Sequence, residues 1–225
     1  FLQSYGVSAS LSVKISRLYW DRAQAIIQQN PYRLVEDMEG VGFLTADRIA
    51  LAMGLPADSP YRVQSALKYT LAEAAAAAGH TYLPREELLF QTQRLLRVEE
   101  ELVQEALQEL LMAREVIAVP LEGPQEGAGE RRGICLPLYF HAEREVAQRL
   151  HALMAAFPRQ KNKGALAALK RFEKAMGVSF SPLQQKAVEA AVNEGVLVIT
   201  GGPGTGKTTV INCIIHLLKK EGEVL

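Results

Sequence analysis

Eight residues near the end of the sequence have the types and spacing of a phosphate-binding loop. Residues 201–208 read Gly-Gly-Pro-Gly-Thr-Gly-Lys-Thr and fit the pattern G-x-x-x-x-G-K-[ST] at every position. The glycines permit backbone torsions that let amide groups curl around phosphate oxygens. Lys207 would place its ammonium group between the β- and γ-phosphates, and the Thr208 hydroxyl would ligate Mg²⁺. The predicted nucleotide-binding residues are Gly202, Pro203, Gly204, Thr205, Gly206, Lys207, Thr208 and Thr209, with Lys207 and Thr208 as the catalytic pair.

The residues on either side of this loop predict the elements that must position it. Residues 196–200 (Val-Leu-Val-Ile-Thr) predict a buried strand before the loop, and residues 207–220 predict a helix after it. A further strand is expected to begin at residues 223–225. Hydrolysis also needs a distal acidic residue that holds Mg²⁺ and orients water. No strand ending in Asp or Glu follows, so we expect a piece of a longer enzyme that is inactive alone.

A glutamine upstream of the loop is a second candidate for nucleotide contact. Residues 180–188 read Phe-Ser-Pro-Leu-Gln-Gln-Lys-Ala-Val and place Gln184 about one helix before the predicted strand. A side-chain amide donates and accepts hydrogen bonds at once, so it can bind the N6/N7 edge of adenine. The alternative is a solvated glutamine on the polar face of a helix.

The first part of the chain contains a pattern typical of a DNA-binding hairpin between two helices. Residues 38–49 (Met-Glu-Gly-Val-Gly-Phe-Leu-Thr-Ala-Asp-Arg-Ile) match h-x-G-h-G-x-x-x-A-x-x-I. The two glycines are expected to allow a tight turn, and the exposed amides can hold a DNA phosphate without contacting bases. The predicted DNA-binding residues are Gly40, Val41, Gly42 and Arg48. A turn that only packs helices is the alternative, and an earlier pair around residues 5–7 lacks the second glycine.

Composition limits the remaining function classes. The chain has 25 basic and 25 acidic residues, so no overall charge indicates a nucleic-acid partner. A local basic stretch over residues 159–174 fits either a solvated linker or a surface that faces phosphates. No apolar run is long enough for a membrane span, and the first residues do not have the basic-then-apolar pattern of a leader. Two distant cysteines, Cys135 and Cys213, fit idle thiols in a reducing cytosol, and we expect a cytoplasmic protein.

These segments predict a mainly α N-terminal region followed by the start of an α/β RecA-like P-loop domain. Residues 1–57 are expected to form a tandem helix-hairpin-helix. Residues 58–140 are expected to form a winged-helix-like domain of three helices and a hairpin, with strands at 116–119 and 133–136 joined through residues 122–132. Residues 141–177 would form a helical and basic connector, and residues 178–225 the start of the ATPase domain.

With these segments in place, the chain resembles the RecD-like branch of superfamily 1 DNA helicases, in its longer, stand-alone form. The matching stretches are Asn30-Pro31-Tyr32 with Leu34, residues 40–43, residues 79–84, residues 136–139 with Glu143, and residues 201–209. The resemblance implies an ATP- and Mg²⁺-dependent motor that moves 5′ to 3′ along single-stranded DNA and unwinds duplexes in DNA repair. It also implies that Gln184, in a Q-x-x-A sequence with Ala187, contacts adenine, and that the partners are single-stranded DNA and DNA junctions.

Two other classes of protein remain open on the residues alone. One is a non-enzymatic DNA-binding module, in which the helical front is the functional part. The other is a different P-loop ATPase of DNA repair or recombination, with an unrelated helical front and different acidic motifs downstream. The polarity of movement is implied by the resemblance only.

Overall fold

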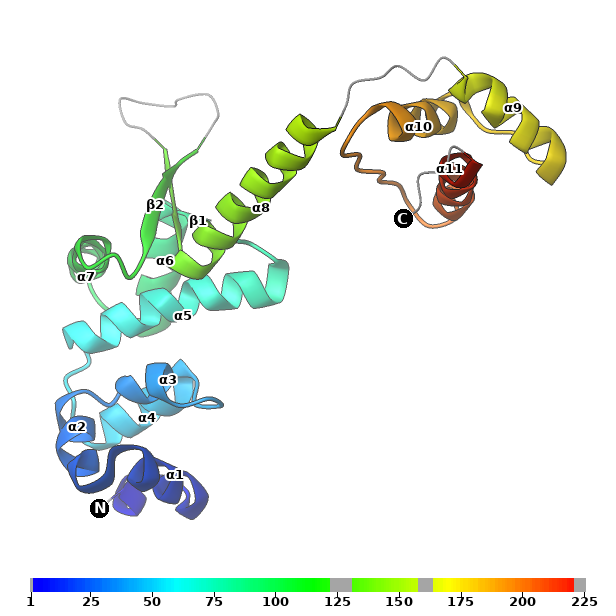
Figure 1. Cartoon of the computed structure of the whole chain (residues 1–225). Helices are drawn as coiled ribbons and strands as arrows, with labels where there is room; N and C mark the ends of the chain where they lie inside the picture. Colours follow the sequence, from blue (N-terminus) through cyan, green and yellow to red (C-terminus); the bar gives the residue numbers. More distant parts are fainter. Residues whose placement is uncertain (1, 122–130, 158–163, 221–225) are drawn as a thin grey trace. The chain divides into compact units, whose positions relative to one another are not determined.

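The computed structural model describes residues 2–121, 131–157 and 164–220, and the chain divides into two compact units (Figure 1). The first unit is Phe1–Ala142 and the second is Glu143–Leu225. Within the described ranges, no helix has the length and apolar composition that crossing a membrane requires. Three predicted features lie outside the described residues. They are the connection at 122–130, the basic residues between 158 and 163, and the strand expected at 223–225.

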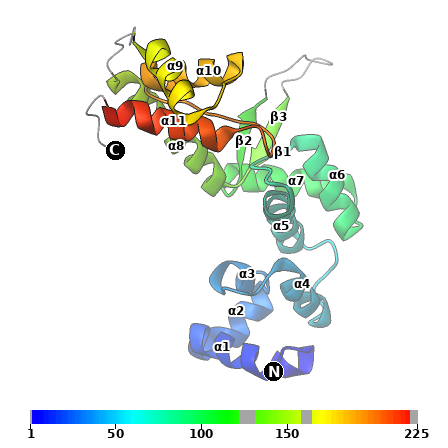
Figure 2. The same cartoon turned by 90° about the vertical axis from the view of Figure 1, so that its right-hand side faces the viewer.

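The first unit begins with short helices arranged around two hairpin turns (Figure 2). In chain order the elements are η1 (Leu2–Tyr5), α1 (Ala9–Tyr19), η2 (Trp20–Arg22), α2 (Ala23–Gln29), α3 (Arg33–Asp37) and α4 (Phe43–Ala52). One turn lies at Gly6, with φ of 77°, and the other at Gly40, with φ of 86°. The next residue in each turn, Val7 or Val41, is buried in a shared apolar core. This arrangement confirms the tandem helix-hairpin-helix.

The second glycine of the pattern is not required by the turn itself, contrary to the expectation from sequence. Gly42 has φ of −88°, which any residue adopts, and a Cβ added there would meet nothing within 4 Å. In the first hairpin Ser8 takes the corresponding place and caps α1, because its Oγ accepts a hydrogen bond from the Leu11 amide at 3.3 Å. The first hairpin is therefore complete without a second glycine.

The rest of the first unit has the element order of a winged helix. Its elements are α5 (Pro60–Ala78), β1 (Leu83–Pro84), α6 (Arg85–Leu96), α7 (Glu100–Met112), β2 (Ile117–Pro120) and β3 (Arg132–Cys135). The strands form an antiparallel sheet in the order β1-β3-β2, with Ala118 opposite Ile134. The predicted hairpin is present, and β1, which pairs Leu83 with Ile134, is an addition that the sequence did not predict. After β3, α8 (Pro137–Ala156) starts earlier than expected, with proline in its first turn.

One hydrophobic core joins the second hairpin to the winged helix, so packing does not stop at the proposed boundary after residue 57. The Phe43 ring stacks on Tyr32, with ring centroids 5.9 Å apart, and on Tyr69 of α5 at 5.1 Å. All three rings belong to the same cluster as the buried face of α5. Residues 1–57 and 58–140 therefore share a core, and their division into two domains stays a prediction.

A buried polar network fixes the same junction. The Arg62 guanidinium in α5 donates to the Asp47 carboxylate of α4 through Nε at 2.8 Å and Nη2 at 3.1 Å, and to the Ala57 carbonyl at 2.8 Å. The Tyr32 hydroxyl donates to Asp47 Oδ1 at 2.6 Å. Burial, followed by this hydrogen bond, raises the pKa of Tyr32, so the hydroxyl remains a donor. Beside the network, Lys68 of α5 pairs with Glu36 and with Glu115.

The second unit packs three helices around a small core. They are α9 (Ala165–Met176), α10 (Pro182–Asn193) and α11 (Lys207–Lys220), and the core includes Leu169, Phe180, Val188 and Cys213. The strand predicted over residues 196–200 does not form. Val198 is 78% exposed, and the sheet found in the described residues lies wholly within the first unit. A parallel strand depends on hydrogen bonds to neighbouring strands, and none pairs with this segment in the part of the chain described.

Candidate nucleotide-binding site

The loop at residues 201–206 leads directly into the first turn of α11. Gly204 and Gly206 have φ of 76° and 78°, which disfavour any residue with a Cβ atom. At Gly206 an added Cβ would also lie 2.8 Å from Gln184 Nε2, and at Gly201 it would lie 2.8 Å from Thr205 Oγ1. Three of the loop's glycines are thus required by backbone torsion or by close approach. The loop ends where the amides and positive dipole end of a 14-residue helix begin, which favours an anion.

The Lys207 side chain curls back over this loop. Its Nζ donates to the Gly201 carbonyl and to the Gly202 carbonyl, each at 2.6 Å. The Thr205 hydroxyl also donates to the Gly202 carbonyl, at 2.9 Å. The ammonium group is therefore held at the concave side of the loop by two neutral acceptors. Phosphate oxygens carry a full negative charge and would be stronger partners for the same ammonium.

The two threonines that follow the lysine lie in the first turn of α11. Thr208 is exposed and Thr209 is half-buried. An exposed hydroxyl next to the loop is free to reach a hydrated cation, and hydroxyl oxygens suit Mg²⁺. Within the described residues no group of three or more His, Cys, Asp or Glu side chains could hold a metal. Thr208 stays the residue of this loop that is predicted to contact Mg²⁺, together with the phosphates of the nucleotide.

Gln184 lies against the loop, although more than twenty residues separate it from Lys207. Its Nε2 donates to the Thr205 carbonyl at 3.0 Å, and its Oε1 accepts from the Ser181 amide at 2.8 Å. The Ser181 hydroxyl accepts from the Gln184 amide in return, which completes a capping box at the start of α10. By contrast, Gln185 donates to the Phe180 carbonyl at 2.9 Å within its own segment. Contact between Gln184 and adenine stays a prediction, but its side chain is fixed beside the loop.

Sequence reasoning missed Ser181 as part of this site. The order Ser-Pro-Leu-Gln at residues 181–184 is the S-x-x-Q signature of a capping box. That signature was sufficient to predict that the Gln184 side chain turns back to the helix start. The bond to Thr205 was not predictable, because it depends on how α10 packs against α11.

The predicted DNA-binding residues lie together in the first unit, apart from the nucleotide loop in the chain. Gly40 and Gly42 are exposed on the hairpin turn, and Val41 is buried below it. Arg48 is exposed on α4 and forms no ion pair with another described residue. The Val41 amide donates to the Met38 carbonyl at 3.3 Å and its side chain is buried in the core, so the exposed parts of the hairpin are the two glycines and the nearby Arg48 cation.

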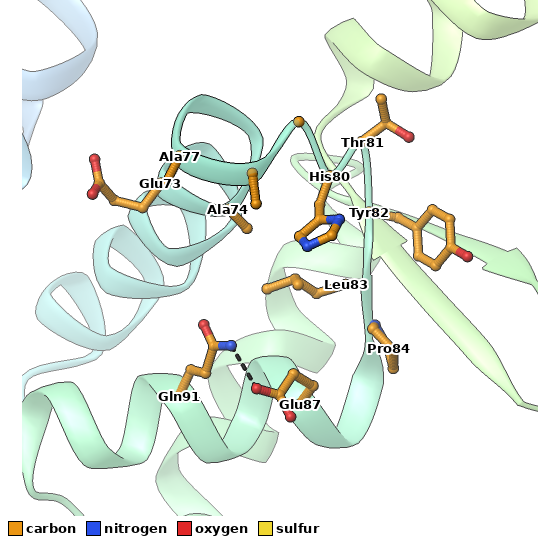
Figure 3. A pocket seen from close by; sticks show the side chains of 12 residues that line it. Glu73, Ala74, Ala77, His80, Thr81, Tyr82, Leu83, Pro84, Glu87 and Gln91 are labelled. Carbon is orange, nitrogen blue, oxygen red and sulfur yellow. Dashed lines mark hydrogen bonds between the residues drawn. The ribbon is translucent and has the colours of Figure 1, made fainter. Parts of the chain in front are cut away.

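A separate hollow of about 830 Å³ lies near the end of α5, against β1 and α6 (Figure 3). Its wall includes the small side chains Ala74 and Ala77 and the polar groups His80, Glu87 and Gln91, the last two hydrogen-bonded at 2.5 Å. It contains no phosphate-binding pattern, so it does not compete with the loop as the nucleotide site.

The helix-hairpin-helix front and the glycine-rich loop before α11 are features typical of a P-loop nucleotide-binding protein that also contacts DNA. Residues 1–82 match the family model described as the HHH domain of the ATP-dependent RecD2 DNA helicase, and residues 184–225 match a model described as an AAA domain. These matches support a RecD-like helicase N-terminal region followed by the start of a motor domain.

Individual relatives support the same family. The ATP-dependent RecD2 DNA helicase of Deinococcus radiodurans is 29% identical over 225 residues, which cover 98% of this chain and 31% of that protein. The RecD subunit of the RecBCD enzyme is 46% identical over 41 residues in Mycobacterium tuberculosis, 18% of this chain and 7% of that subunit. In Mycolicibacterium smegmatis it is 35% identical over 86 residues, 38% of this chain and 14% of the subunit. The chain thus spans about a third or less of the length of these relatives.

Proposed function

We propose that this chain is part of an ATP-dependent DNA helicase that couples hydrolysis to movement along single-stranded DNA and to duplex unwinding. The observation that supports this most is the loop at 201–206, whose glycine torsions and Lys207 ammonium form a cradle for phosphates. The Deinococcus radiodurans relative is named as an ATP-dependent DNA helicase, which supports the same activity. A 5′-to-3′ polarity and a role in DNA repair belong to this proposal and rest on the resemblance, and a cytoplasmic location, also proposed, rests on the cysteine content of the sequence.

The site residues have distinct roles in this proposal. The amides of residues 202–206 surround the β-phosphate, and Lys207 leaves its two carbonyl partners to pair with the β- and γ-phosphates. Thr208 supplies a hydroxyl ligand to Mg²⁺, which neutralises charge on the transferred phosphate. The acidic residue that completes hydrolysis is expected beyond the matched part of the motor domain.

The helical front is proposed to hold DNA through its phosphates. Gly40 is explained by its torsion, but Gly42 has an ordinary φ and open space around it. A glycine that the fold does not need is expected where another backbone approaches closely. The Val41 amide already donates to the Met38 carbonyl, so the amides that follow it, at Gly42 and Phe43, and the Arg48 guanidinium would bind phosphate oxygens of single-stranded DNA or of a junction without contact to bases.

Strand displacement tests this function. The full-length enzyme is expected to release an oligonucleotide from a duplex with a 5′ single-stranded tail, and to require both ATP and Mg²⁺. A duplex with a 3′ tail and a blunt duplex are the controls, and little release is expected from either. Equal release from all three substrates, or release without ATP, would contradict the proposal.

Replacement of Gln184 by alanine is expected to weaken ATP binding and the preference for ATP over GTP by roughly 5- to 150-fold. The estimate follows from about 1–3 kcal/mol for a good amide–adenine contact. Nucleotide titration of the full-length enzyme measures both effects. Gln185→Ala is the matched control, because Gln185 bonds only to Phe180 in its own segment. Similar losses of ATP affinity in the two variants would mean that nucleotide binding depends on an intact α10 helix and not on contact between the Gln184 amide and adenine.

A further inference from the structure

Trp20, the single tryptophan of the sequence, occupies an unusual position at the end of α1. Its φ of 51° and ψ of −133° lie in a region that favours glycine, and a residue with a Cβ is strained there. The residue is nevertheless 78% exposed, so burial of the indole does not offset the strain. Strained, exposed residues of this kind concentrate at sites that bind ligands.

The surface next to the indole combines apolar and polar groups in two shallow hollows. The hollows have volumes of about 320 and 370 Å³, and Trp20 belongs to the wall of both. Ser12 lies in both walls as well, and its Oγ is buried without a hydrogen-bond partner in the described part of the chain. The polar residues Gln3 and Ser16 also line both hollows, and Arg17 lines one of them. This surface offers a flat aromatic face beside several hydrogen-bonding side chains.

Three cations lie close to Trp20 in the sequence, and one of them, Arg17, lines a hollow together with the indole. Lys14 and Arg17 lie one turn apart on α1, and Arg22 follows Trp20 in η2. All three are exposed, and none pairs with an acidic side chain among residues 2–121, 131–157 and 164–220. Asp21 is the one acidic residue in this short segment. The local charge therefore favours a polyanion over a neutral or basic partner.

We propose that Trp20 stacks on a base of single-stranded DNA, while Arg17, which lines the same hollow, contacts a flanking phosphate and Lys14 and Arg22 add positive charge to this segment. Aromatic stacking combined with a positively charged surface is how proteins bind unpaired strands without sequence preference. The first hairpin unit would then hold the unpaired strand, and the hairpin at Gly40 would hold phosphates. This inference rests on the proposed function, because it takes DNA as the partner.

The test compares Trp20→Gly and Trp20→Phe in the full-length enzyme by fluorescence anisotropy with labelled oligothymidylate. Trp20→Gly is expected to reduce affinity for single-stranded DNA roughly 5- to 150-fold, the range measured for loss of one stacked base. Trp20→Phe keeps an aromatic face and is expected to stay within about threefold of the wild type. Affinity for blunt duplex should be the same in all three proteins.

Thermal unfolding separates binding from a structural role. Because glycine adopts the torsions of residue 20 without strain, Trp20→Gly is expected to unfold at a higher temperature than the wild type. An oligonucleotide with abasic sites should bind wild type and Trp20→Gly equally. Unchanged affinity of Trp20→Gly for single strands would overturn the inference, and so would a lower unfolding temperature combined with weaker binding to every DNA.

Oligomeric state and DNA binding by the wild type separate failure of this inference from failure of the proposed function. If Trp20→Gly converts a dimer to a monomer in sedimentation while its DNA affinity is unchanged, the indole contacts a second copy of the chain and the inference is wrong. If the wild type binds no DNA at all, the proposed function fails together with this inference. If the wild type unwinds DNA and Trp20→Gly binds single-stranded DNA with the affinity of the wild type, the inference fails and the proposed function stands.

Discussion

Full-length enzyme with Lys207→Ala is expected to hydrolyse ATP at least about 100-fold more slowly than the wild type, as when a preorganised donor to a developing charge is removed. The Lys207 ammonium bonds two loop carbonyls at 2.6 Å, and in the proposed function it leaves them to balance the charge of the γ-phosphate. Steady-state phosphate release with saturating single-stranded DNA measures the effect. DNA binding should be retained, since the helical front does not depend on this side chain.

The matched control is Lys219→Ala, which removes an exposed lysine from the same helix. It is expected to hydrolyse ATP like the wild type and to unfold at the same temperature. Lys207→Ala should also keep its fold, because hydrogen bonds at the surface contribute only about 1 kcal/mol each. Normal hydrolysis by Lys207→Ala would show that the loop is not the catalytic site.

Asp47→Ala is expected to lower the free energy of unfolding by about 3–5 kcal/mol, the cost of leaving a buried charge without its partner. Arg62 is 7% exposed, and in the variant its guanidinium would lose both hydrogen bonds to Asp47 while it keeps the one to the Ala57 carbonyl. The Tyr32 hydroxyl would lose its acceptor as well. Urea unfolding followed by circular dichroism measures the loss.

Two comparison variants make this result specific. Replacing both partners, as Asp47→Ala with Arg62→Met, removes the unpaired charge and is expected to recover most of the stability. Glu145→Ala breaks an exposed ion pair with Arg149 in α8 and is expected to cost less than about 1 kcal/mol. A loss in Asp47→Ala no larger than in Glu145→Ala would mean that the junction between α4 and α5 is held by its aromatic core alone.

The loop was predictable from sequence because the positive φ angles of its backbone require glycine at fixed positions. Gly204 and Gly206 have the positive φ that the pattern requires, whatever surrounds them. The prediction of a strand at 196–200 is wrong. A strand forms only when neighbouring strands pair with it, and the hydrophobicity of the segment itself does not show whether they do. β1 was missed for a related reason, because two residues are too few to show a period.

Contacts between distant segments account for the other differences. Two contacts cross the predicted boundary after residue 57, the stacking of Phe43 on Tyr69 and the ion pair of Asp47 with Arg62. Neither produces a pattern in the sequence near those residues. Trp20 was not a predicted site residue. Its positive φ could not be expected from the sequence, because tryptophan rarely adopts that backbone conformation. By contrast, the capping box at Ser181 was visible in the sequence before the structure showed it.

Competition between nucleotides for a fluorescent ATP analogue bound to the full-length enzyme with Mg²⁺ shows directly whether the loop binds through phosphate. ATP and ADP are expected to displace the analogue at similar concentrations, because both carry the β-phosphate that residues 202–206 and Lys207 would surround. AMP and adenosine should be weaker by two orders of magnitude or more. If adenosine competes as well as ADP, or if ADP does not compete, then the loop at 201–208 is not a nucleotide site and the helicase assignment loses its basis.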